Sequence, residues 1–149
     1  ETSKEYFSFV WKHYYEMQMP MLLSFKRVFG DLETFHVHAV CLNNQALNSK
    51  KNDNSFMSKE FYLDKYFFNY KNYFAGINAM SISDISGIPR ATVIRKLDKL
   101  IEEKFLKIDN KKHYSVTGIH RKKLLEVQQA TFRNLSKLAS RIYNLRLAK

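Results

Sequence analysis

The segment from Ile77 to Leu100 constrains the fold of this chain more than any other, because it combines helix starts and a helix stop. Asn78 is a good N-cap, since its side-chain oxygen can accept a hydrogen bond from the first helical turn. Ile77 before it and Ile82 four residues after it have the spacing of a hydrophobic staple. We therefore predict a helix over residues 79–86.

A sharp turn and a second helix should follow at once. Gly87 can adopt the positive φ that ends a helix in a tight turn. Ile88 then fills the corner, and Pro89 stands where a first helical residue would, with φ already near the helical value. The second helix is predicted to run over residues 89–104.

The predicted second helix has two different faces. An apolar stripe follows the i, i+4, i+7, i+8 spacing of a buried helix face: Val93, Leu97, Leu100 and Ile101. The opposite face presents small, polar and basic residues: Ala91, Thr92, Arg95 and Lys99. Taken alone, such a basic face is explained better by simple exposure to solvent.

The residues after this helix alternate as a β-hairpin does. Phe105, Leu106 and Ile108 form a short strand, residues 109–112 are prone to turn, and residues 113–116 return as a second strand. The hairpin carries four residues with basic or ionisable side chains: Lys107, Lys111, Lys112 and His113.

Together these features resemble the winged helix-turn-helix of bacterial regulators. The string GIPRATV matches the turn and the start of the recognition helix, with a small residue at Ser83, the turn at Gly87 and an apolar residue at Val93. Residues 114–118 resemble the strand-to-helix junction of multiple-antibiotic-resistance (MarR-type) regulators. Two positions depart from the pattern, Ser86 and Lys96, where apolar residues are more usual; Lys96 should pack its stem and keep its ammonium in water.

The resemblance implies sequence-specific binding of double-stranded DNA by a transcriptional regulator. The recognition helix, about residues 89–104, would enter the major groove, and the wing, about 106–116, would lie on the backbone or in the minor groove. An arginine at the start of such a helix can donate two hydrogen bonds to one guanine, to O6 and to N7. The candidate DNA-binding residues are Arg90, Ala91, Thr92, Arg95, Lys96, Lys99, Asn110, Lys111, Lys112 and His113.

The distribution of charge agrees with a polyanionic partner. Residues 1–80 carry nine Lys/Arg and eight Asp/Glu, whereas residues 81–149 carry sixteen and six, a local excess of ten positive charges. Single-stranded RNA is disfavoured, because its readers usually expose aromatic rings and the basic half has few. The alternative is a protein–protein interaction module on a winged-helix scaffold without direct DNA binding.

The rest of the chain is predicted to be helical, so the fold class is mainly α with a two-stranded wing. Residues 1–57 form an N-terminal helical region for dimerisation or sensing, residues 58–117 the DNA-binding domain, and residues 118–149 a long C-terminal helix. Pro20 should kink the first helix or divide it in two. Gly30 and Asp31 should end it and cap a second helix, whose apolar face would be Phe35, Ala39, Leu42 and Ala46.

Two of these helices have alternative roles. The aromatic stripe over residues 58–74 is read as core packing, with a small-molecule effector pocket as the alternative. The last helix, about 118–147 with Thr117 as N-cap, would pair with another chain in a homodimer or pack against the N-terminal helices. At 1.5 Å per residue its length is about 45 Å.

The composition and motifs exclude other classes. No run of about 18 apolar residues exists, so we expect no membrane partner. Cys41 is the single cysteine, which predicts no internal disulfide and a cytoplasmic setting, nucleoid-associated in a bacterium. His38 and Cys41 could share a metal, but two ligands make a weak zinc site. No phosphate-binding glycine loop or catalytic motif occurs, so neither an enzyme nor a cofactor is expected.

Overall fold

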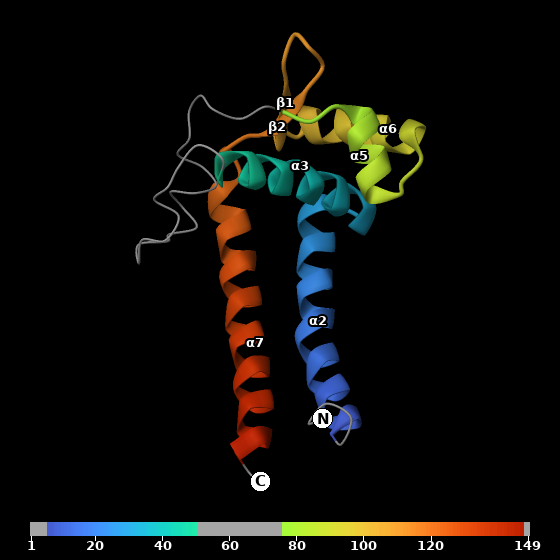
Figure 1. Ribbon diagram of the computed structural model, residues 1–149. Coiled ribbons are helices and arrows are strands. Elements are labelled where there is room, and N and C mark those ends of the chain that lie inside the picture. The colour runs from blue at the N-terminus through green and yellow to red at the C-terminus, as the bar shows by residue number, and fades with distance from the viewer. Residues whose placement is uncertain (1–5, 51–75, 148–149) are drawn as a thin grey trace. The chain divides into compact units, whose positions relative to one another are not determined.

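The computed structural model describes residues 6–50 and 76–147 and is mainly helical, with a small antiparallel sheet (Figure 1). The elements are α2 (Phe7–Phe29), α3 (Leu32–Lys50), α5 (Ala79–Ser86), α6 (Arg90–Glu102), β1 (Leu106–Ile108), β2 (Tyr114–Val116) and α7 (Arg121–Leu147). They separate into two compact units. Unit 1 contains the chain up to Gly30 and from Lys122 onward, and unit 2 is Asp31–Arg121. These boundaries differ from the divisions after residues 57 and 117 expected above.

Unit 2 is organised around α3, which packs against α5, α6 and β2. Burial of the apolar face of each element against the others gives one continuous core. The side chains with no exposed surface at all include Val37 from α3, Ile82 from α5, and Val93, Leu97 and Leu100 from α6. α3 therefore belongs to the same compact unit as the predicted DNA-binding elements.

The start of α5 is as the sequence predicts. The Asn78 side chain accepts a hydrogen bond of 2.9 Å from the backbone N–H of Ser81, and Ile77 and Ile82 are both buried. Gly87 adopts φ 69° and its N–H donates to the carbonyl of Ser83. α6 begins one residue later than expected, because Pro89, with ψ 136°, takes the N-cap position and Arg90 is the first helical residue.

α6 ends at Glu102 instead of Lys104. The prediction was two residues too long because Lys104 adopts φ 61°, a left-handed conformation that no helix continues through. The N–H of Phe105 then donates to the carbonyl of Leu100 at 2.8 Å. This closure turns the chain directly from α6 into β1.

The hairpin that follows is antiparallel, with Leu106 opposite Val116 and Ile108 opposite Tyr114. Ile77 adds a third partner that the sequence did not reveal: it exchanges two backbone hydrogen bonds with Tyr114, of 3.1 and 2.9 Å. Gly76 permits this approach, since a Cβ there would lie 2.8 Å from the Cβ of His113. The residues that start α5 are thus tied to the hairpin.

The predicted apolar face of α3 is wrong. Phe35, Ala39 and Leu42 are only half-buried, and the face that packs consists of Thr34, Val37, His38, Val40 and Cys41. Apolar spacing failed here because two of the buried side chains are polar. Thr34 is accommodated inside because its hydroxyl and backbone N–H both donate to the carboxylate of Asp31.

Unit 1 consists of α2 and α7, which run side by side in opposite directions (Figure 1). α2 is one helix from Phe7 to Phe29 and is not divided at Pro20. The carbonyl of Pro20 accepts a hydrogen bond of 2.8 Å from the Ser24 hydroxyl. At the end of α2, Gly30 adopts φ 86° and its N–H donates to Lys26, as the predicted helix stop requires.

α7 begins at Arg121, three residues later than predicted, and Thr117 is not its N-cap. The Thr117 hydroxyl instead donates to the carbonyl of Lys104 at the end of α6. The aromatic stripe over residues 58–74, including the effector pocket considered there, lies outside the described residues.

Candidate nucleic-acid interface

Two serine hydroxyls hold the corner between α5 and α6. The hydroxyl of Ser83 donates to the carbonyl of Ile88 at 2.7 Å, and the oxygen of Ser86 accepts from the N–H of the same residue at 3.2 Å. Both backbone groups of Ile88 are therefore paired while its side chain is buried. Ser86, which departs from the usual apolar residue, has a structural role in fixing the direction of α6.

α6 separates its faces as the sequence predicts. Val93, Leu97 and Leu100 have no exposed surface, whereas Arg90, Ala91 and Arg95 are exposed and Thr92 and Lys99 are half-buried. The Lys99 ammonium lies 4.0 Å from the carboxylate of Glu103. Two further acidic residues, Asp98 and Glu102, are also exposed on α6, so the outer face is mixed in charge, and Lys99 lies in the last turn of the helix.

Lys96 does not lie with the other candidates on this face. Its ammonium is 2.8 Å from the carboxylate of Asp31 and 3.6 Å from that of Glu33, both at the start of α3. Only 13% of its side chain is exposed. The expectation that its stem packs is confirmed, but its ammonium is held in ion pairs within unit 2 instead of lying free in water.

The hairpin turn is shaped by Asp109. One of its carboxylate oxygens accepts hydrogen bonds from the backbone N–H groups of Lys111, at 2.8 Å, and His113, at 2.9 Å. These bonds, with the nearby imidazole and ammonium, lower the pKa of Asp109. The turn closes through Lys112 at φ 59°. A single carboxylate thus organises the loop that carries the candidate basic side chains.

The side chains of the turn are accessible. Asn110, Lys111 and Lys112 are exposed, as is Lys107 on β1, and His113 is half-buried with its Nδ1 3.7 Å from the carboxylate of Asp109. The structure therefore brings the predicted residues into two sets in unit 2. One set lies on the outer face of α6 and the other on the hairpin that follows it (Figure 1).

Three residues that position these sets were missed by the sequence reasoning. The amide oxygen of Gln45 on α3 accepts a hydrogen bond of 3.1 Å from the N–H of Val116 on β2. Thr117 joins the end of β2 to the end of α6. Gly76 permits the contact with Ile77 described above. Of these three residues, only Gly76, which directly precedes the predicted staple and N-cap, left a signal in the sequence. The hydrogen bond between Gln45 and Val116 joins residues 71 positions apart, and such a contact has no local sequence pattern.

The core of unit 2 contains a histidine and a thiol beside each other on α3. Burial, together with the nearby His120, lowers the pKa of His38 to about 4, and burial raises the pKa of Cys41 to about 12. Both side chains are therefore neutral at pH 7, and a neutral thiol is a poor metal ligand. Within residues 6–50 and 76–147, no three His, Cys, Asp or Glu side chains gather as a metal site.

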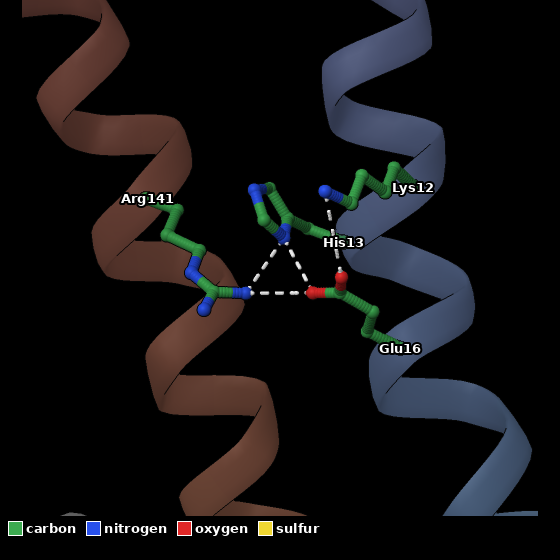
Figure 2. Close-up of polar contacts among 4 residues, drawn as sticks. All are labelled: Lys12, His13, Glu16 and Arg141. Atoms are coloured by element: carbon green, nitrogen blue, oxygen red, sulfur yellow. Dashed lines mark hydrogen bonds and ion pairs between the residues drawn. The ribbon is translucent and has the colours of Figure 1, made fainter.

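Unit 1 carries a separate polar cluster between its two helices. Arg141 of α7 contacts the carboxylate of Glu16 at 3.1 Å and Nδ1 of His13 at 2.6 Å, and His13 is 2.7 Å from Glu16 (Figure 2). The hydrogen bond with His13, helped by Arg141 and Lys12, lowers the pKa of Glu16. The groove here has a volume of about 190 Å³ and is lined by residues of both charges, including Lys137.

No family model, no curated protein and no solved structure matches this chain. Across the described ranges, none of the helices combines the length and the apolar character needed to span a bilayer. The geometry of the two units and the chemistry of their exposed side chains are therefore what bears on function.

Proposed function

We propose that unit 2 is a winged helix-turn-helix and that the protein binds double-stranded DNA as a transcriptional regulator. One observation carries the proposal: a tight α5–Gly87–α6 corner is followed directly by an antiparallel hairpin, and basic side chains are exposed on both α6 and the hairpin. A corner of this kind lets one helix enter a groove while the other crosses the backbone.

In this proposal α6 lies in the major groove with its N-terminal end toward the bases. Arg90, the first residue of α6, and Arg95, near its middle, are exposed and can donate two hydrogen bonds each to guanine O6 and N7. Thr92 can contact phosphate or a thymine methyl group. The hairpin cations, Lys107, Lys111 and Lys112, would neutralise phosphate on the backbone or beside the minor groove.

Binding of DNA by these groups should depend steeply on salt. Five exposed cations lie on α6 and the hairpin, and each neutralised phosphate contributes about −0.9 to the slope of log K against log salt. Fluorescence anisotropy with a mixed-sequence duplex, measured from about 50 to 300 mM salt, should therefore give a slope of roughly −5.

Arg95→Ala provides the residue-level test, with Arg27→Ala as a matched control that removes the same charge from an exposed position on α2. Arg95→Ala, which removes a proposed base contact, should weaken binding to a duplex that the wild-type protein enriches from a random pool, while Arg27→Ala should not. Equal behaviour of the two variants would refute the assignment of the reading face. No binding of the wild-type protein at the lowest salt would refute DNA binding and favour the protein-interaction alternative, with an acidic partner.

The proposal includes a homodimer formed through unit 1. Large apolar side chains stand exposed on its helices, with 39% to 65% of each accessible: Phe7, Trp11, Tyr15, Met19 and Leu23 on α2, and Phe132, Leu135 and Tyr143 on α7. At roughly 200 Å² per large side chain, these eight leave about 900 Å² of apolar surface. A standard dimer interface takes about 800 Å² from each partner, so the exposed apolar area is large enough to support a second copy as the partner.

The oligomeric state tests this part of the proposal. Sedimentation of the full chain should give twice the 17.7 kDa of one copy, and Phe132→Glu should weaken association by at least about 10-fold. Gln129→Glu, an exposed polar position on the same helix, introduces the same charge and should leave the dimer intact. A wild-type protein that is monomeric at all concentrations would exclude the dimer.

A further inference from the structure

Lys96 lies on α6 between residues assigned to DNA, yet its own charge is already paired. Its ammonium is 2.8 Å from Asp31 and 3.6 Å from Glu33, and its side chain is 13% exposed. Arg95, the preceding residue, is exposed. Neighbouring basic residues of one helix are therefore directed differently, one outward and one toward the start of α3.

The two carboxylates belong to the N-terminal end of α3, where the helix dipole favours negative charge. One oxygen of Asp31 caps α3 by accepting from the backbone N–H of Thr34 at 2.7 Å, and the other accepts from Lys96. Partial burial of Asp31 opposes ionisation, but the hydrogen bonds from Lys96 and Thr34 outweigh it and hold its pKa at about 2. One ionised carboxylate thus joins the cap of α3 to the middle of α6.

We infer that Lys96 is a positioning residue, which fixes the rotation of α6 on α3 and so directs Thr92, Arg95 and Lys99 toward DNA. The inference rests on the proposed DNA binding. The fully buried side chains of α6, which are Val93, Leu97 and Leu100, are apolar. Apolar contacts are non-directional, whereas an ion pair to a capped helix end defines one rotation of α6.

Direct contact between Lys96 and a phosphate is unfavourable by the same geometry. If the ammonium moved to DNA, Asp31 and Glu33 would be left unpaired beside a polyanion, and like charges at short range repel. With Lys96 in place, one of their two negative charges is neutralised within unit 2. The ion pair therefore also reduces the repulsion between the start of α3 and the DNA.

Asp31→Asn tests this role, with Asp98→Asn as its matched control. Asparagine caps a helix about as well as aspartate, so the variant keeps the cap of α3 and removes the charge that holds Lys96. Asp98 is exposed on α6, and its variant makes the same change in net charge. Electrostatics alone would tighten DNA binding in both variants.

Two duplexes separate positioning from simple attraction: one enriched by the wild-type protein from a random pool, and one of mixed sequence. We expect Asp31→Asn to bind the enriched duplex about 3- to 10-fold more weakly, with mixed-sequence binding, which depends on phosphate contacts, unchanged or tighter. Asp98→Asn should keep or improve both affinities. Glu33→Gln, which removes the 3.6 Å contact, should act like Asp31→Asn with an effect of about 2-fold.

The opposite result has a clear signature. If Asp31→Asn tightens binding to both duplexes and steepens the salt slope by about one unit, Lys96 has been released to a phosphate and the positioning role is wrong. If the wild-type protein binds neither duplex, the proposed function itself fails. A double-mutant cycle of Asp31→Asn and Lys96→Met, measured by thermal unfolding, distinguishes failure of the ion pair from failure of DNA binding. If the two substitutions are coupled in unfolding free energy, the ion pair stabilises the fold without any role in DNA binding.

Discussion

The two units of this protein differ in how far their large apolar side chains are buried. In unit 2, Ile82, Val93 and Leu97 come from neighbouring elements and have no exposed surface. In unit 1, Met19 and Phe132 are 60% and 65% exposed. Two helices alone have too few faces to enclose a core, whereas three helices and a hairpin can. The most fully buried apolar side chains are therefore in unit 2, although its Ile85 and Ile119 are 63% and 64% exposed, and unit 1 leaves large apolar side chains exposed on both of its helices.

The largest expected effect comes from truncating a leucine in the core of unit 2. Leu97→Ala should lower the free energy of unfolding by about 2–5 kcal/mol, since it leaves a cavity where nothing is exposed. Leu135→Ala on α7, where the leucine is 48% exposed, should cost less than about 1 kcal/mol in the isolated chain. Thermal melts followed by circular dichroism measure both changes.

Protein concentration sharpens this comparison. If unit 1 is covered by a second copy, the loss from Leu135→Ala should grow at concentrations where the wild-type protein is dimeric, because association contributes to stability by mass action. The loss from Leu97→Ala should be similar at every concentration. Equal losses for the two variants at low concentration would contradict the difference drawn between the units.

The sequence predicts the α5–α6 corner well because its determinants are local. Asn78, Gly87 and the stripe ending at Leu100 act over a few residues, so capping, positive φ and helical spacing could be recognised directly. The two hairpin strands were found for the same reason. The candidate side chains of α6 and of the hairpin are exposed or half-buried, and Lys96 is paired with Asp31 at the start of α3.

The features that escaped prediction depend on contacts between distant residues. Thr34 and His38 are buried polar residues that apolar spacing does not include. The partner of Lys96 lies more than 60 positions away, at Asp31. The pairing of Ile77 with Tyr114 is likewise non-local. Such contacts are decided by tertiary packing, which no short window of sequence encodes.

A smaller effect is expected at Gly76, where the chain approaches the hairpin. Gly76→Ala places a Cβ 2.8 Å from the Cβ of His113 and 3.0 Å from the carbonyl oxygen of Tyr114. The resulting shift should cost about 1–3 kcal/mol of unfolding free energy. Gly87→Ala is the contrast, since a Cβ there meets no atom within 4 Å and only the φ of 69° opposes it, at about 1–2 kcal/mol.

The two glycine variants should also differ in which backbone amides exchange hydrogen faster. Gly76→Ala should increase amide hydrogen exchange at Ile77 and Tyr114, whose backbone groups bond each other. Gly87→Ala should leave those two amides protected and affect the α5–α6 corner. If the Ile77 amide stays protected from exchange in Gly76→Ala, the hairpin has shifted without losing its backbone hydrogen bonds to Ile77.

The smallest expected effect is the acid sensitivity of the ion pair at Asp31. The carboxyl group has a pKa of about 2 in the folded chain, against an ordinary value of 3.8. Because the folded pKa is the lower one, the stabilisation is complete above about pH 4 and is lost as the pH falls toward 2. Asp31 is partly exposed, so solvent screening limits this contribution to no more than about 1 kcal/mol.

Lys96→Met isolates this contribution from the other carboxylates of the chain. It keeps the length of the side chain and removes the ammonium that lowers the pKa of Asp31. Unfolding free energies measured between pH 5 and 2 should fall less steeply in Lys96→Met than in the wild-type protein. Lys12→Met, which removes an exposed ammonium 3.9 Å from Glu16 in unit 1, should leave the titration of Asp31 as it is. If Lys96→Met and Lys12→Met reduce the pH dependence of the unfolding free energy equally, the ion pair at the start of α3 does not hold α6 in place.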